Sequence, residues 1–195
     1  VFLFLALAGP ASAAAGAGEL DARGVQLLAE GRFLEAEALF SRSLAIDPAN
    51  PGTLANRSTA RHKLENDDGA IADFKAAVGL RKKLKGVLAP SISRSYLRRS
   101  RALLAKGKPD DALKDLYEAV RLDRRNAEAL AGIGALAVRQ GDFSTALPYL
   151  DRALKLRPDM AQALRDRASA LRGLGRAADA QRDETRALEI SPALP

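Results

Sequence analysis

The sequence contains no cysteine and a single histidine, His62, among its 195 residues. Without cysteine the chain can form neither disulfide bonds nor thiolate metal sites, and one histidine excludes a metal site built from several imidazoles. The sequence also has no Gly-x-Ser-x-Gly motif, no Walker-type glycine-rich loop and no dinucleotide-binding fingerprint. These absences predict a protein that is not an enzyme and that binds no metal ion or cofactor.

Charged residues are plentiful but unequal in sign. The chain has 31 Lys and Arg residues against 24 Asp and Glu residues, which gives a formal net charge of +7 at pH 7. This excess favours acidic partners, although on a helical protein much of it is solvated surface. The composition, 47% apolar and 28% charged, is that of a folded soluble protein, and the length is within that of a single domain.

The first eight residues are wholly apolar, and they are followed by Gly9-Pro10 and Ala11-Ser12-Ala13. A short apolar run before a small-x-small site resembles a secretory signal peptide. The run is too short to span a bilayer, which needs about 20 apolar residues. We expect residues 1–15 to be a partial, cleaved signal peptide, residues 14–18 to be flexible, and the protein to be periplasmic or secreted, or lumenal in a eukaryote. The alternative is an apolar N-terminal helix of the fold.

The segment of residues 127–160 contains two apolar runs with helical spacing. Gly141-Asp142 separates the two runs, and Arg157-Pro158-Asp159 ends the second one. This pattern predicts a helix–turn–helix hairpin of 34 residues. Three small residues lie where its two helices must approach closely: Gly134, Ala146 and Ala153.

The hairpin pattern recurs along the chain. The residues equivalent to Ala146 are Ala36, Ala70, Ala112 and Ala180, and the successive steps are 34, 42, 34 and 34 residues. The turn residue Gly141 recurs as Gly31, Gly107 and Gly175, with Glu65 in the second copy. These small, apolar and proline positions at a 34-residue period resemble the tetratricopeptide repeat. The resemblance implies an all-α, right-handed superhelical solenoid of about five repeats over residues 17–195, at about residues 17–50, 51–84, 93–126, 127–160 and 161–194.

The 42-residue step leaves eight extra residues, Lys85 to Ile92. Because Gly86 and Pro90 disfavour a helix, we predict a loop here. We interpret the preceding basic cluster as cations that stabilise the C-terminus of a helix through its dipole, in preference to a binding role. The cluster comprises Arg81, Lys82, Lys83 and Lys85. The last helix of the fifth repeat is polar around Glu184, which indicates a terminal cap.

In tetratricopeptide arrays the first helix of each hairpin lines a concave surface that usually binds a peptide or a partner helix. The resemblance therefore implies a non-catalytic scaffold or adaptor, whose ligand we expect to contact Asn56, Arg94, Arg98, Arg101, Arg139 and Arg172. Other residues expected to face inward are Asp21, Ala22, Val25, Leu28, Ala55, Thr59, His62, Lys63, Leu97, Glu128, Ala131, Ala135, Arg165, Asp166 and Ser169. Because arginine forms bidentate bonds with carboxylates, we expect an acidic protein or peptide ligand. Alternatively, these arginines are surface charges paired with Asp and Glu.

Two alternatives remain for the function. The segment Leu54-Ala55-Asn56-Arg57-Ser58 resembles the second repeat of co-chaperones that hold the C-terminal carboxylates of a heat-shock protein. Asn56, Arg94 and Arg98 match part of that dicarboxylate clamp, whereas Asp21 and Val25 replace its first-repeat Lys and Asn. The second alternative is a helical-repeat RNA binder. Because the Gly, Ala and Pro positions fit the tetratricopeptide pattern better, we expect no nucleic-acid partner. We also expect no transmembrane segment in the mature chain.

Overall fold

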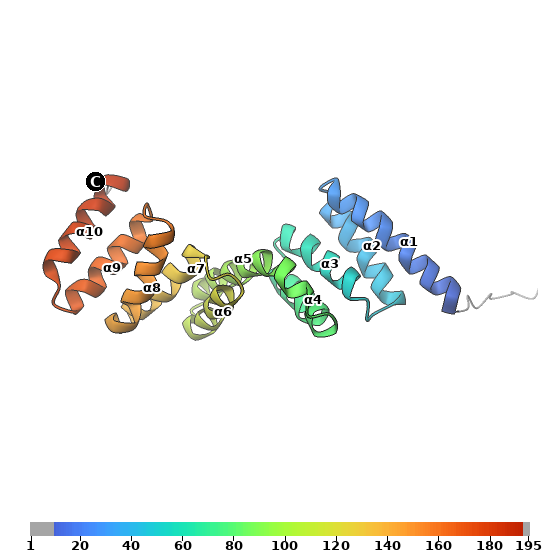
Figure 1. Ribbon diagram of the computed structural model, residues 1–195, viewed down its shortest axis with the longest axis horizontal. Coiled ribbons are helices and arrows are strands. Elements are labelled where there is room, and N and C mark those ends of the chain that lie inside the picture. The colour runs from blue at the N-terminus through green and yellow to red at the C-terminus, as the bar shows by residue number, and fades with distance from the viewer. Residues whose placement is uncertain (1–9, 193–195) are drawn as a thin grey trace, which may run out of the picture. The chain divides into compact units, whose positions relative to one another are not determined.

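The structure of the protein, a computed structural model, describes residues 10–192, and their side chains from residue 16 onward. The described residues form ten α-helices and no strand (Figure 1), which confirms the predicted all-α repeat fold. Successive helices pair into five hairpins. These are α1 (Pro10–Ala29) with α2 (Phe33–Ile46), α3 (Pro51–Lys63) with α4 (Asp67–Leu80), α5 (Leu84–Ala105) with α6 (Pro109–Leu122), α7 (Ala127–Arg139) with α8 (Phe143–Leu156), and α9 (Ala161–Gly173) with α10 (Ala177–Ile190).

The chain divides into two compact units, residues 1–95 and residues 96–195. The first unit contains α1 to α4 and the beginning of α5, and the second contains the rest of α5 and α6 to α10. Within each unit, the first helix of a hairpin packs on its second helix and on the preceding hairpin, as α3 packs on α4 and α2.

Helix boundaries follow capping residues and turn residues. Asn126 accepts a hydrogen bond from the backbone N–H of Ala129 at the start of α7, and Asp142 likewise begins α8. Such caps contribute about 1 kcal/mol each. Between these helices Gly141 has a φ of 76°, in the left-handed region that glycine adopts without strain, which confirms its predicted place in the turn. Glu65 takes the same role in the second hairpin at a φ of 59°.

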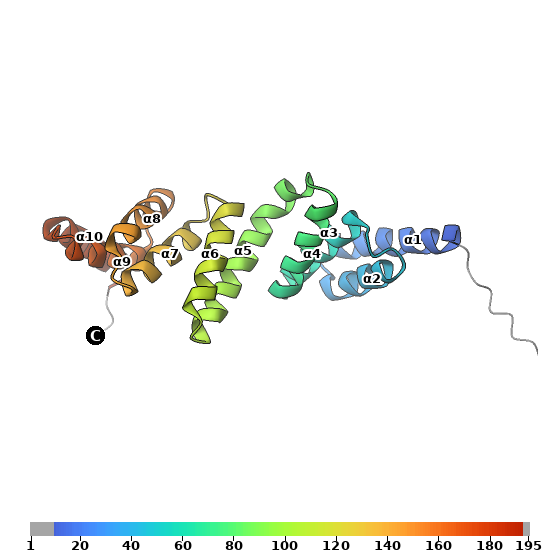
Figure 2. The same cartoon turned by 90° about the horizontal axis from the view of Figure 1, so that it is seen from below.

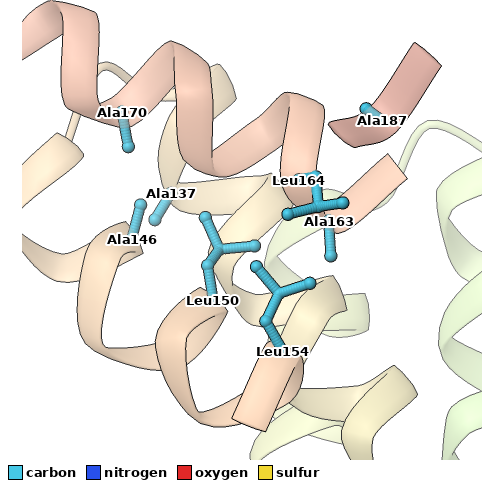
Figure 3. Close-up of a cluster of buried hydrophobic side chains, with 8 residues drawn as sticks. All are labelled: Ala137, Ala146, Leu150, Leu154, Ala163, Leu164, Ala170 and Ala187. Carbon is cyan, nitrogen blue, oxygen red and sulfur yellow. The ribbon is translucent and has the colours of Figure 1, made fainter. Parts of the chain in front are cut away.

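The helices approach each other closely at the predicted small residues. A Cβ atom on Gly134 would lie 2.5 Å from Cγ of Leu150, so α7 and α8 can pack at this distance only because the side chain is absent. Ala146 is fully buried in the same contact. Figure 3 shows Leu150 and Leu154 of α8 beside Leu164 of α9, in the apolar cluster that joins the fourth and fifth hairpins.

An arginine bound to a buried aspartate joins the two helices of three hairpins. Arg57 donates from Nε and Nη2 to the two carboxylate oxygens of Asp73, both at 2.8 Å. The equivalent pairs are Arg99 with Asp115 and Arg167 with Asp183. Each pair is separated by 16 residues in sequence, from the first helix to the second. Sequence reasoning missed these pairs, because the spacing has a meaning only once the geometry of the hairpin is known.

The N-terminal helix corrects one expectation. Residues 1–9, most of the predicted signal peptide, lie outside the described residues. Helix α1 begins at Pro10, and proline is favourable at the first position of a helix. Ala17 is buried, and its carbonyl oxygen accepts a hydrogen bond of 3.2 Å from Ser43 Oγ. The prediction that residues 14–18 are flexible is therefore wrong, whereas export stays a prediction.

The predicted loop over Lys85 to Ile92 is helical. Helix α5 continues through Gly86 and Pro90, although a proline inside a helix costs about 3 kcal/mol or more. Leu88, Ala89 and Ile92 lie on this stretch and are buried. Since burial of a Leu or Ile side chain contributes about 1.5–3 kcal/mol each, packing offsets the proline.

The basic cluster between α4 and α5 corrects another interpretation. Helix α4 ends at Leu80 with no basic residue in its last turn, and Arg81 is its C-cap. Lys82 and Lys83 lie in the turn, and Lys85 lies in the first turn of α5, where the helix dipole disfavours a cation. Arg81, Lys82 and Lys83 thus follow the C-terminus of α4 as interpreted, whereas Lys85 does not fit this interpretation.

Candidate functional site

The second unit contains a groove of about 560 Å³ between the first helices α5, α7 and α9. We call it the α5–α7–α9 groove. Buried and half-buried apolar residues line it: Leu97, Leu104, Leu116, Ala131, Ala135 and Ala163. Polar residues also line it: Ser100, Arg101, Glu128, Arg157, Gln162 and Asp166. On α7 the lining residues follow the i, i+3 and i+7 spacing of one helix face, so the repeat itself places them together.

An ion-paired cluster of three residues lies in this groove. Nη2 of Arg101 contacts Oε2 of Glu128 at 2.5 Å, and Nη1 of Arg157 contacts Oε1 at 2.8 Å. Burial would raise the pKa of Glu128, but the hydrogen bonds from Arg101 and Arg157 outweigh it and hold that pKa below its ordinary value. Two guanidinium groups share one carboxylate, so the cluster keeps a formal charge of +1.

A second carboxylate in the groove has the opposite environment. Burial raises the pKa of Asp166, and this effect exceeds those of its hydrogen bond with Gln162 and of the nearby charges of Arg139 and Arg165. Nε2 of Gln162 lies 3.0 Å from Oδ1 of Asp166. In the groove, hydrogen bonds from arginines therefore outweigh the cost of burying the charge of Glu128, whereas for Asp166 the cost of burial is larger than its favourable contacts.

The groove contains several of the residues predicted to face inward but only one of the six predicted contact residues. Five of the residues expected to face inward line the groove: Leu97, Glu128, Ala131, Ala135 and Asp166. Of the six predicted contact residues, Arg101 lines this groove. Arg98, Arg139 and Arg172 belong to the same unit but lie outside the lining residues, and Arg172 pairs with Glu184. Asn56 and Arg94 belong to the first unit, half-buried and exposed respectively.

Sequence reasoning missed Arg157, Gln162 and Leu104. Arg157 follows the last residue of α8, at a repeat position that holds Asp47, Arg81, Asp123 and Ser191 in the other copies. This position has no constant character, so the sequence carries no signal for it. The guanidinium group of Arg157 reaches Glu128 on α7 from the end of α8.

Asp21 lies where the dicarboxylate clamp has its first-repeat lysine, and its carboxylate is bound within the first unit. Oγ1 of Thr53 on α3 donates a 2.5 Å hydrogen bond to Oδ2 of Asp21 on α1, and Oδ1 of Asp21 is buried without a hydrogen-bond partner. His62 is also packed inside this unit, with Nδ1 at 2.8 Å from Oγ of Ser95.

No group of three or more His, Cys, Asp or Glu residues that could hold a metal ion occurs in the part of the chain that the structure describes. No helix of that part is both long and apolar enough to cross a membrane.

Comparisons with known proteins agree with the repeat fold. Two family models, both described as tetratricopeptide repeat, match residues 93–126 and 132–195. The chain is 31% identical over 150 residues to DnaJ homolog subfamily C member 3 of Gallus gallus, a match that covers 72% of this chain and 29% of that protein. It is 31% identical over 117 residues to the Hsp70-Hsp90 organizing protein of Triticum aestivum, covering 60% of this chain and 19% of that protein. The chain thus spans less than a third of the length of these relatives.

Solved structures show the same fold. A crystal structure of MamA aligns with a TM-score of 0.59 at 20% identity and covers 90% of this chain and 91% of its own. A crystal structure of YrrB, described as a TPR protein with an unusual peptide-binding site, aligns with a TM-score of 0.60 at 18% identity over 89% of this chain and 86% of its own. At these identities the alignments support the all-α repeat fold.

Proposed function

We propose that this chain, which contains tetratricopeptide repeats, is a non-catalytic adaptor. It binds a peptide segment or a partner helix in the α5–α7–α9 groove. Tetratricopeptide-repeat proteins mediate protein–protein interaction. The observation that carries the proposal is the groove itself, in which apolar side chains from three successive first helices lie beside charged groups. Apolar lining with a few placed polar groups is the usual composition of a ligand site.

The arginines of the groove favour an acidic ligand. Arg101 and Arg157 are more than half exposed, and both bind Glu128. An acidic side chain of the ligand would add a second carboxylate to the two guanidinium groups and neutralise their remaining formal charge. An apolar ligand side chain beside it would contact Ala131 and Ala135.

Occlusion of the groove tests the binding site. Peptides would be selected from a random library displayed on phage, and the affinity of an enriched peptide would be measured by fluorescence anisotropy. Ala135→Trp fills the groove and should weaken binding by about tenfold or more, which corresponds to about 1.4 kcal/mol. Ala102→Trp lies on α5 at an exposed position outside the lining residues and should leave binding unchanged. Equal affinities of the two variants would place the ligand elsewhere.

Charge removal tests the acidic ligand. Arg101→Ala/Arg157→Ala should weaken binding of an acidic peptide and remove most of the salt dependence of its affinity. The matched control, Arg152→Ala/Lys155→Ala, removes two exposed cations of α8 that do not line the groove. If the enriched peptides are not acidic, or if both variants bind equally well, the ligand is not selected by these arginines. A labelled single-stranded RNA serves as a second probe, and binding of RNA in place of peptides would favour the RNA-binding alternative.

The second candidate function is a co-chaperone with a partial dicarboxylate clamp. The likeness to the Hsp70-Hsp90 organizing protein favours it, and the internal hydrogen bond of Asp21 counts against it. A peptide with a free, acidic C-terminus would be compared with the same peptide amidated at its C-terminus. Loss of binding on amidation, together with loss in Asn56→Ala and not in Ala135→Trp, would select the clamp.

Export is proposed on the apolar residues 1–8 and on the Ala11-Ser12-Ala13 site. Sequencing the N-terminus of the protein isolated from its source tests it. A mature chain that begins near residue 14 or 16 supports export, and a chain that retains residues 1–13 contradicts it.

A further inference from the structure

Positive charge is concentrated in one segment of the chain. Eleven Lys and Arg residues and no Asp or Glu lie between Asp73 and Asp110. The rest of the chain holds 20 basic and 24 acidic residues, so its formal charge is negative. The whole excess of positive charge therefore comes from this segment, and of its cations only Arg101 lines the α5–α7–α9 groove.

The densest part of this segment is the turn from α4 to α5, which can be followed in Figure 2. Arg81, Lys82, Lys83 and Lys85 are all exposed there. Two aliphatic side chains are exposed beside them, Leu80 at 54% and Val87 at 77%. We call these six residues the α4–α5 basic patch. It lies wholly in the first unit.

The positive charges of the α4–α5 basic patch are not neutralised within the fold. None of its four cations forms an ion pair with a residue that the structure describes. The nearest carboxylate along the chain, that of Asp73, is already bound to Arg57 and Arg61. The dipole of α4 does not account for Lys85, which lies in the first turn of α5. Four unpaired cations over five residues repel one another, and an anionic partner would relieve that repulsion.

The side chains around the cations indicate which anionic partner fits. Proteins that bind single-stranded nucleic acid stack bases on exposed aromatic rings, whereas Phe74 and Tyr96, the aromatic residues of this basic segment, are both buried. Lys and Arg beside exposed aliphatic side chains are the composition that binds an anionic lipid surface, because the cations meet the head groups and the aliphatic groups enter the acyl boundary. We propose that the α4–α5 basic patch docks on an anionic membrane surface, with Leu80 and Val87 inserted between lipids.

Sedimentation with lipid vesicles tests the proposal on the full chain. We expect binding to vesicles of phosphatidylcholine with added phosphatidylserine, and little binding to phosphatidylcholine alone. Since one cation near such a surface contributes about 1 kcal/mol, roughly fivefold, Lys82→Glu/Lys83→Glu should lower the partition coefficient by about 25-fold or more. Arg124→Glu/Arg125→Glu makes the same charge change at exposed residues of the second unit and should lower it far less. Circular dichroism checks that both variants stay helical, as expected for exposed positions.

Fluorescence tests the insertion of the patch. The chain has no tryptophan, so Val87→Trp introduces a single reporter. Its emission should shift to the blue with phosphatidylserine vesicles, whereas the emission of Leu34→Trp, at a position that is 71% exposed on α2, should not. Three outcomes would overturn the proposal. These are no sedimentation of the wild-type chain at about 0.15 M salt, equal losses in the two charge-reversed variants, and displacement of the chain from vesicles by single-stranded RNA that it binds more tightly through the same lysines.

Discussion

The hairpins α5–α6 and α7–α8 have equivalent residues 34 positions apart but different contacts between their helices. In α5–α6 Arg99 binds Asp115 through two hydrogen bonds. At the equivalent positions α7–α8 has Ile133, which is buried, and Tyr149, whose ring meets Tyr117 of α6 edge to face at 6.2 Å, and α7 packs on α8 where Gly134 meets Leu150. The same hairpin can thus be held by an ion pair or by apolar contacts. Mutations should therefore destabilise the two kinds of hairpin differently, because removal of one partner of an ion pair leaves a buried charge.

The largest expected effect is at Asp73, which binds both Arg57 and Arg61 and whose side chain is 5% exposed. Asp73→Ala leaves the largely buried guanidinium group of Arg57 without a carboxylate and that of Arg61 with Glu37 alone, and should lower the free energy of unfolding by about 3–5 kcal/mol. Asp151→Ala is the control, because Asp151 also binds an arginine but is more than half exposed and should cost under about 1 kcal/mol. Urea denaturation measures both, and equal losses would show that burial does not strengthen these pairs.

The next effect concerns the close contact of α7 with α8. Gly134→Ala places a methyl group against Leu150 and should destabilise by about 1–3 kcal/mol, although alanine favours a helix by about 1 kcal/mol over glycine. In the fifth hairpin the equivalent residue is Ala168, which is fully buried beside Leu171 and Ala180. Ala168→Gly should therefore cost the difference in helix propensity, about 1 kcal/mol, and the burial of one methyl group, about 0.8 kcal/mol. A more stable Gly134→Ala variant would show that α7 and α8 are not in tight contact.

A smaller effect on stability is expected when the ion pair of α5–α6 is replaced by the apolar residues of α7–α8. Arg99→Ile/Asp115→Tyr gives the third hairpin the residues of the fourth. Because a buried ion pair replaced by packed apolar residues is often neutral, the double variant should lie within about 1.5 kcal/mol of the wild type. Arg99→Ile alone should be clearly less stable than the double variant. If the double variant loses as much stability as the single one, the ion pair is specifically required in this hairpin.

The smallest effects are the pH dependences of the two groove carboxylates, which should have opposite signs. The pKa of Asp166 is raised in the folded state, so its contribution to stability is present below the ordinary carboxyl pKa and is lost as pH rises through the folded pKa. Asp166→Asn should therefore stabilise the protein slightly at pH 7. The pKa of Glu128 is lowered, so its contribution is present at neutral pH and is lost as pH falls through the folded pKa, and Glu128→Gln should destabilise slightly.

Both groove effects should be under about 1 kcal/mol, because solvent screens half-exposed groups. Thermal melting at pH 7 and near pH 4 measures them. Below about pH 4, where an ordinary carboxyl is protonated, Asp166→Asn should melt with the wild type. A stabilisation that persists there would show that the amide makes a new contact and that ionisation is not its cause.

The repeated positions of the sequence were enough to predict the hairpins. Gly141 and Gly134 have roles that follow from local conformation and from the size of a side chain, and both roles are visible in a one-dimensional pattern. The prediction failed at Pro90, where local preference favoured a loop and the burial of Leu88 and Ile92 maintained a helix. Local preference is a weak guide where a few kcal/mol of burial oppose it.

The groove was predicted in part, for the same reason. Leu97, Ala131 and Asp166 were placed correctly because the repeat period fixes which face of a first helix they occupy. Arg157 and the role of Glu128 as a shared partner were not predicted, since they depend on how far a long side chain reaches between helices.

Periodicity, side-chain size and backbone freedom along the chain were enough to predict the number of hairpins and their turns, and the resemblance to the tetratricopeptide repeat predicted several of the residues that line the groove. Which charges are neutralised within the fold followed only from the packing of the helices. Arg57, Arg99 and Arg167 are bound to aspartates, Arg101 and Arg157 share a glutamate, and the lysines between α4 and α5 remain without an ion pair among the described residues. Coulombic pairing depends on distances in space, and residues 16 or more positions apart acquire those distances only when the helices pack.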